Sequence, residues 1–159
     1  MNFLADVMLK KAGRWLRILG FDCAFPESED DDAILEQASN RGLVLLTKDE
    51  ELIARARKAG IRVFGVTKVH NVKQVAEIMN AFCLKPPSTL TPTKCASCNG
   101  LLRRAKKGEV SGKVHKNVLA NRRAFWVCAN CGHIFWKGSH WERIEDEFRL
   151  IRKELAKLD

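Results

Sequence analysis

The stretch Leu43-Val44-Leu45-Leu46-Thr47-Lys48-Asp49 decides the predicted fold. Four consecutive apolar residues are typical of a strand that is buried on both faces, as strands of parallel sheets are. The polar residues that follow lead into a helical pattern containing Leu52, Ile53 and Ala56. The sequence therefore predicts a central strand that runs directly into a helix.

Similar strand-and-helix pairs lie on both sides of this stretch. Short apolar runs at 3–5, 23–25 and 62–66 predict three more strands, and the patterns at 8–19, 30–38 and 72–82 predict helices. Alternation of this kind predicts an α/β fold with a mostly parallel sheet and helices on both of its faces.

A proline-rich stretch predicts the boundary between two units. Three of the four prolines lie within 85–93, which predicts a linker between an N-terminal domain, 1–84, and a C-terminal domain, 94–159. Residues 1–92 carry 13 basic and 12 acidic side chains, whereas residues 93–159 carry 15 and 7. This local positive charge favours a nucleic-acid partner over a merely solvated surface.

Composition narrows the class of protein. The chain has 159 residues, 46% of them hydrophobic and 30% charged, which suits a packed core. No apolar run approaches the roughly 18 residues needed to cross a bilayer, so no membrane partner is expected. The first residues do not have the pattern of a signal peptide, which favours a cytoplasmic protein. In that compartment cysteines are more often metal ligands or buried thiols than disulfides.

Four aspartates are predicted to meet at one edge of the parallel sheet. Asp6 ends the first strand, Asp30 and Asp31 precede the second helix, and Asp49 follows the central strand. Clustered carboxylates suit a hard cation such as Mg²⁺ or Mn²⁺, which can activate water and stabilise the leaving oxygen of a phosphodiester. The alternative is that each aspartate only caps its helix, and for Asp32 we prefer that interpretation.

A basic stripe follows Asp6 along the first predicted helix. Lys10, Arg14 and Arg17 are spaced by four and three residues, which places them on one helix face. They are candidate contacts to the phosphates that flank a scissile bond. A solvated helix face is the alternative, and the sequence favours neither.

Two C-x₂-C pairs, Cys95/Cys98 and Cys128/Cys131, predict a zinc site. Four thiolates complete a tetrahedral Zn²⁺ site and leave no open position for water, so the zinc would be structural. The 29 residues between the pairs are more than is usual, and a hairpin or loop would fill the gap. The gap carries the candidate RNA contacts Arg103, Arg104, Arg122 and Arg123. The aromatic residues near the second pair can stack bases or can pack as a small core over the zinc turn, and for Phe125 and Phe135 we prefer the packing role.

The C-terminal residues predict a helix with an apolar seam. Ser139 and Glu142 are spaced as in a capping box. The seam is expected to dock on the rest of the chain or on a second copy, which would make a homodimer. Its members are Trp141, Ile144, Phe148, Ile151, Leu155 and Leu158.

Several of these motifs together resemble the Mut-seven C-terminal RNase domain family, a PIN-like nuclease group. The matching stretches are 3–9, 14–22, 30–31, 45–49 and 131–141. The resemblance implies a PIN-like α/β domain followed by a zinc ribbon and a C-terminal helix. It also implies a metal-dependent ribonuclease, in which Asp6, Asp31 and Asp49 match the acidic positions and Asp30 is adjacent.

The leading hypothesis is therefore a cytoplasmic ribonuclease that uses Mg²⁺ or Mn²⁺ and holds RNA through a basic zinc ribbon. A first alternative is an RNA- or ribosome-binding protein whose acidic site has weak or no activity. A second alternative, ranked last, is a phosphoacceptor receiver module. That class also has acidic residues after its first and third strands, but it needs a fifth strand that the pattern does not contain.

Overall fold

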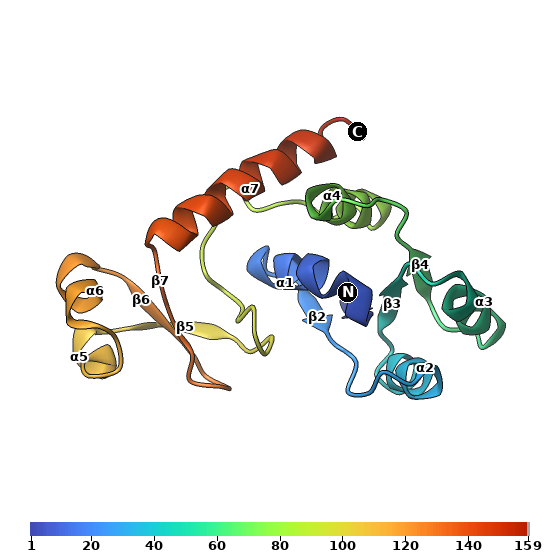
Figure 1. Cartoon of the computed structure of the whole chain (residues 1–159), viewed down its shortest axis with the longest axis horizontal. Helices are drawn as coiled ribbons and strands as arrows, with labels where there is room; N and C mark the ends of the chain where they lie inside the picture. The colour runs from blue at the N-terminus through green and yellow to red at the C-terminus, as the bar shows by residue number, and fades with distance from the viewer. Residues whose placement is uncertain (159) are drawn as a thin grey trace.

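The computed structural model describes residues 1–158 and contains two sheets (Figure 1). The first sheet is parallel, as predicted, and its strand order is β2-β1-β3-β4. Its strands are β1 (Asn2–Ala5), β2 (Asp22–Ala24), β3 (Val44–Thr47) and β4 (Val63–Gly65). Between and after them lie the 3₁₀ helix η1 (Val7–Leu9) and the helices α1 (Lys10–Ile18), α2 (Asp31–Asn40), α3 (Glu50–Lys58) and α4 (Asn71–Ala81).

Helices cover both faces of the parallel sheet. Successive strand residues point to opposite faces, so Phe3 packs with α1 and α4, whereas Leu4 packs with α2 and α3. All four residues of β3 are buried, which explains its continuous apolar run. Helix α1 lies close to the sheet at Gly13, where an added Cβ would be 2.6 Å from the Phe25 ring. Close packing of the helices on both faces of the sheet therefore fixes the positions of the strand ends.

The second sheet is antiparallel with the order β5-β6-β7. Its strands are β5 (Leu102–Ala105), β6 (Phe125–Cys128) and β7 (Ile134–Trp136). Two short helices, α5 (Lys107–Val110) and α6 (Lys116–Asn121), fill the long gap between the cysteine pairs. The local core is small and includes Ala105, Val110 and Phe125.

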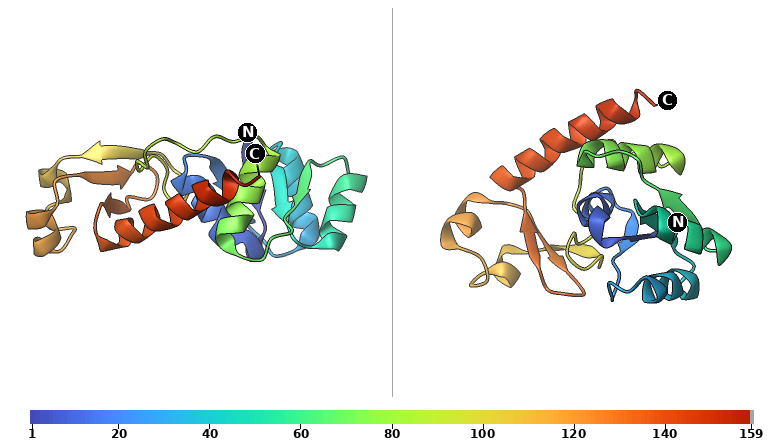
Figure 2. Two further views of the ribbon diagram at one scale, coloured as in Figure 1. Left: turned by 90° about the horizontal axis from the view of Figure 1, so that it is seen from above. Right: turned by 45° about the vertical axis from the view of Figure 1, so that its right-hand side comes forward.

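The C-terminal helix α7 (Ser139–Leu155) returns to the N-terminal sheet and lies beside α4 (Figures 1 and 2). Trp141, Phe148 and Ile151 are buried in the same core as Phe3. The prediction that the seam docks on its own chain is thus confirmed. Most of the seam that suggested a homodimer is covered within the chain, but its predicted last member, Leu158, lies beyond the end of α7 and is 44% exposed. Homodimerisation stays a prediction.

The predicted capping box of α7 is wrong. Gly138 occupies the N-cap position and Ser139 is already helical, so its hydroxyl makes no capping bond. The Glu142 backbone N–H instead donates to the Gly138 carbonyl at 3.1 Å. The helix therefore begins one residue earlier than a capping box at Ser139 requires, and glycine at the N-cap has no side chain to make a capping bond.

The predicted linker is packed against the fold. Residues 84–93 form neither helix nor strand, yet Leu90 is only 3% exposed and belongs to the same core as α4 and α7. The division of the chain at this stretch remains an interpretation. In the described part of the chain, no helix combines the length and the apolar character needed to span a bilayer.

Candidate active site and metal centre

The strand order reverses between β1 and β3. From β1 the chain proceeds to β2 on one side, and from β3 it proceeds to β4 on the other side. Open α/β sheets bind ligands beyond the carboxyl ends of the strands at such a reversal. Asp6 follows β1 at this point, and its backbone N–H donates to the carbonyl of Leu46 in β3 at 2.9 Å. The sheet therefore places the ends of β1 and β3 side by side.

Asp6 is a buried carboxylate, 8% exposed, with both oxygens oriented by hydrogen bonds. The Val7 backbone N–H donates to Oδ1 at 2.5 Å, and the Thr47 hydroxyl donates to Oδ2 at 2.6 Å. Each carboxylate oxygen has a further lone pair, so both can still accept a donor or bind a cation. The Asp6 carboxylate is thus held in one orientation and keeps lone pairs for a further ligand.

Asp49 is linked to Asp6 through Thr47. The Asp49 backbone N–H donates to the Thr47 hydroxyl oxygen at 3.1 Å, while that hydroxyl donates to Asp6. The exposed Asp49 side chain caps α3 by accepting from the Leu52 N–H at 2.9 Å. Sequence reasoning missed Thr47, although a hydroxyl residue at the end of an apolar strand was the signal for it.

The other two aspartates have partners of their own. Asp30 caps α2, where its Oδ2 accepts from the Ala33 N–H at 3.0 Å. Asp31 accepts from Arg55 Nη1 at 3.0 Å, and Asp32 is ion-paired with the same guanidinium. The prediction that Asp32 caps α2 is therefore wrong. Arg55, on α3, had no signal in the sequence because only folding brings it to the start of α2.

The acidic edge offers few potential metal ligands that lie close together. Within the described residues, the four cysteines are the one group of three or more potential ligands that lie close enough to share an ion. The aspartates follow three adjacent strands but do not form such a group. Mg²⁺ is usually held by only one or two carboxylates together with substrate phosphates, and Asp6 and Asp49 can supply these.

The basic stripe on α1 is only partly exposed. Lys10 and Arg14 face solvent, but Arg17 is 3% exposed and the prediction that it binds phosphate is wrong. Its Nε donates to the Cys23 carbonyl at 2.7 Å, and Nη1 donates to the carbonyls of Ala96 and Ser97 at 2.9 and 2.7 Å. Burial lowers the pKa of Arg17 from its ordinary value. This side chain joins the parallel sheet to the loop of the first cysteine pair.

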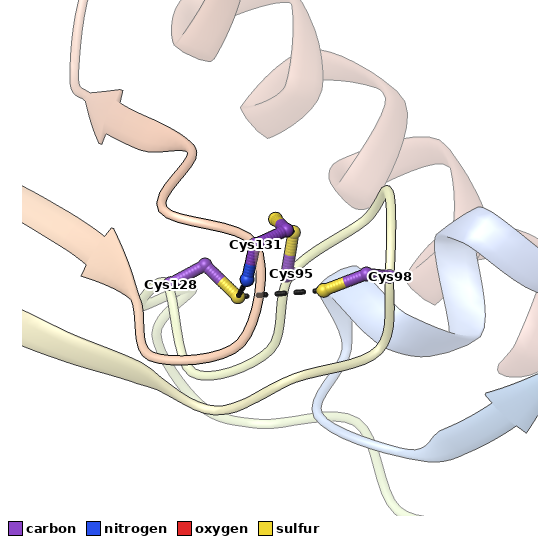
Figure 3. A group of neighbouring side chains, drawn as sticks. All are labelled: Cys95, Cys98, Cys128 and Cys131. Carbon is purple, nitrogen blue, oxygen red and sulfur yellow. Dashed lines mark hydrogen bonds between the residues drawn. The ribbon is translucent and has the colours of Figure 1, made fainter.

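The four cysteines converge at the end of the antiparallel sheet (Figure 3). All four sulfurs lie within 4.8 Å of one another, with 3.7 Å between Cys95 and Cys131 and 3.4 Å between Cys98 and Cys128. Tetrahedral Zn–S bonds of about 2.3 Å place sulfurs about 3.8 Å apart, and a disulfide needs about 2.05 Å. The geometry therefore suits zinc and excludes these pairs as disulfides.

Polar contacts favour the thiolate at Cys98, whereas the pKa of Cys95 is raised, chiefly by burial. Burial raises the pKa of Cys98, but hydrogen bonds from the Gly100 backbone, the Asn130 side chain and neighbouring thiols lower it overall to about 6. A Cβ on Gly100 would lie 2.9 Å from the Cys128 sulfur, so this turn needs glycine. The loops approach closely because no side chain separates them.

The four predicted basic contacts of the second sheet do not form one surface. Arg103 and Arg104 are consecutive in β5 and so point to opposite faces. Arg103 is ion-paired with Glu109 at 2.8 Å, and the Arg104 guanidinium lies 5.3 Å from the centre of the Trp126 ring. Arg122 and Arg123 precede β6.

Fold and site together define a class: an α/β protein with carboxylates at the reversal of a parallel sheet, joined to a four-cysteine metal centre. The model of the Mut7-C RNAse domain family matches residues 1–148, and the chain belongs to that family. Membership indicates a nuclease-type function. A search of curated proteins found no match.

Proposed function

We propose that the chain is a ribonuclease that uses Mg²⁺ or Mn²⁺ at the carboxyl edge of its parallel sheet and holds RNA through the zinc ribbon. Asp6 and Asp49 would hold the metal, with Asp30 adjacent, and Asp31 would join them once it is released from Arg55. The observation that carries the proposal is the hydrogen-bonded series from Asp6 through Thr47 to Asp49. It lies where the strand order reverses, in a chain whose family indicates a nuclease-type function.

The residues at this edge have distinct roles in the proposal. A divalent ion bound there would lower the pKa of a water molecule and offset the charge of the scissile phosphate. Thr47 keeps Asp6 in one orientation, so no side-chain reorganisation is needed when substrate arrives. Lys10 and Arg14 are exposed on the helix that follows Asp6 and would contact flanking phosphates.

Cleavage of labelled single-stranded RNA by the zinc-loaded full-length chain tests the proposal. Mn²⁺ is omitted in the control reaction, because a chelator would also remove zinc from the cysteines. We expect Mn²⁺-dependent cleavage that falls at least a hundred-fold in Asp6→Asn. Asp146→Asn, at an exposed position of α7, is the matched control and should retain activity. Equal activity of both variants would reject the site.

A second candidate is an RNA-binding protein with a weak or inactive site. The observation that favours it is the ion pair of Asp31 with Arg55, which occupies one of the expected metal ligands. This candidate predicts RNA affinity without cleavage at any Mn²⁺ concentration. RNA binding measured beside the cleavage reaction therefore separates the two functions.

A further inference from the structure

An apolar pocket lies where the two sheets meet the C-terminal helix. It has a volume of about 120 Å³ and is lined by α1, the loop before Cys95, β7 and α7. The lining includes Ile18, Phe135, Trp136, His140 and Trp141. None of these residues belongs to the acidic edge or to the zinc site, so neither metal centre accounts for the pocket.

The pocket has the size and lining of an aromatic-ring site. Apolar cavities of about 150 Å³ bind benzene, so this volume suits one six-membered ring. Trp136 is 36% exposed, although it is a large aromatic side chain at the end of a strand, whereas Trp141 is 9% exposed. An exposed indole beside a pocket of this kind offers a stacking surface.

Two cations lie beside the pocket. A Cβ built on Gly138 would lie 3.3 Å from Trp136 Nε1 and 3.7 Å from Arg122 Nη2, so the guanidinium flanks the same glycine as the indole. The Lys137 ammonium lies 5.1 Å from the centre of the Trp141 ring. These charges suit a ligand that combines an aromatic ring with an anionic group.

A basic path also connects the pocket to the acidic edge. Lys11, Arg14 and Ile18 lie on one face of α1, at intervals of three and four residues. Lys11 and Arg14 are exposed, and Ile18 lines the pocket. Helix α1 begins beside Asp6 and extends about 13 Å for its nine residues, at roughly 1.5 Å each. One strand of RNA can therefore follow this helix.

We infer that this pocket is a nucleobase subsite, in which a pyrimidine of single-stranded RNA stacks on Trp136 while α1 contacts the phosphates. The inference rests on the RNA-binding part of the proposed function and needs no cleavage. A nucleobase of RNA fits better than an apolar protein side chain, because Arg122 and Lys137 lie beside the pocket and residues 93–159 as a whole carry an excess of eight positive charges.

The test measures affinity for a fluorescent oligouridine and for the same oligonucleotide with abasic positions. Zinc-loaded Asp6→Asn protein is the background, so that RNA stays intact. We expect Trp136→Ala to weaken oligouridine binding about ten-fold, because one stacked base is worth about 1–3 kcal/mol, and to leave abasic binding unchanged. Trp136→Phe should keep the affinity, whereas Trp136→Leu should lose it although the pocket stays apolar.

Leu150→Ala is the matched control, since Leu150 is 52% exposed on α7 and lies outside the pocket. It should bind both oligonucleotides as the background does. Equal weakening of both oligonucleotides in Trp136→Ala, or no weakening, overturns the subsite and leaves the pocket to a protein side chain. Base-dependent binding without any cleavage by the parent chain would reject the nuclease but support the subsite.

Discussion

The Thr47 hydroxyl donates a 2.6 Å hydrogen bond to the Asp6 carboxylate, between the two strands at which the order of the sheet reverses. Thr47 is fully buried, so its hydroxyl has no water with which to replace this bond. The pair therefore depends on the register of β1 and β3, which places Ala5 opposite Leu46.

Thr47→Val tests this pair. Valine has a similar shape but no hydroxyl, so a buried carboxylate oxygen loses a donor, at a cost of about 1–3 kcal/mol in the free energy of unfolding. We expect RNA cleavage to fall about ten-fold or more, because Asp6 is no longer fixed. Thr47→Ser keeps the hydroxyl and should retain most of the activity. Urea unfolding and cleavage rates give the two readouts, and full activity in Thr47→Val would contradict the role.

Arg55→Gln tests whether Asp31 holds the metal. Removing the guanidinium leaves Asp31 and Asp32 without their cation, so the edge becomes more negative. Exposed ion pairs are worth about 0.2–1 kcal/mol, and we therefore expect Mn²⁺ affinity to rise about two- to five-fold. Calorimetry on zinc-loaded protein measures it. Arg57→Gln, on the same helix, is the control, and equal affinity in both variants would remove Asp31 from the metal site.

Arg17 and Arg14 lie on the same helix, but we expect substitution of Arg17 to lower stability and substitution of Arg14 to lower RNA affinity. Arg17→Met leaves three backbone carbonyls without their donor, and we expect a loss of roughly 3 kcal/mol or more in unfolding free energy. Arg14→Met removes an exposed charge, so its stability should change by less than about 0.5 kcal/mol. RNA affinity should fall in Arg14→Met instead. Chemical denaturation measures the free energy of unfolding, and fluorescence anisotropy measures RNA affinity. Equal stability of the two variants would contradict the buried hydrogen bonds of Arg17.

The thiols should differ in reactivity according to their place in the fold. In zinc-loaded protein Cys83 is exposed and should react at once with a thiol reagent, whereas Cys23 is buried and should react only on unfolding. Removing zinc with a chelator should expose the four clustered thiols and loosen the antiparallel sheet, whose own core is small. Absorbance titration with a thiol reagent, with and without chelator, counts the reactive thiols. Rapid labelling of all six before chelation would contradict zinc binding.

Cys23 should also make stability fall at alkaline pH. Burial raises the pKa of its thiol from 9.0 to about 12. Between these values the unfolded chain loses a proton that the folded chain keeps, so the free energy of unfolding decreases as pH rises. One such group contributes up to about 1.4 kcal/mol per pH unit. Urea midpoints from pH 9 to 11 should decline less steeply in Cys23→Ala, and parallel declines would contradict this.

The sequence was informative where one local pattern has one structural outcome. The apolar run at Leu43–Leu46 predicted a buried strand, which the structure has at Val44–Thr47, and the strand-and-helix alternation predicted the parallel sheet. Cysteine spacing likewise indicated the metal centre, since C-x₂-C places two sulfurs on one turn. These features depend on neighbours within a few residues.

Long-range partners decided the rest. Arg17 and Arg14 are both basic residues of one helix, and nothing local shows that the first is buried against Ala96 while the second faces solvent. Arg55 on α3 forms an ion pair with Asp31 on α2, and nothing local to either residue shows this. The sequence by itself determined the strands and helices of the N-terminal unit and the four cysteines that cluster, because hydrophobic period and C-x₂-C spacing are local. Only the tertiary structure decided which charges are free, because burial and pairing depend on segments far apart in the chain.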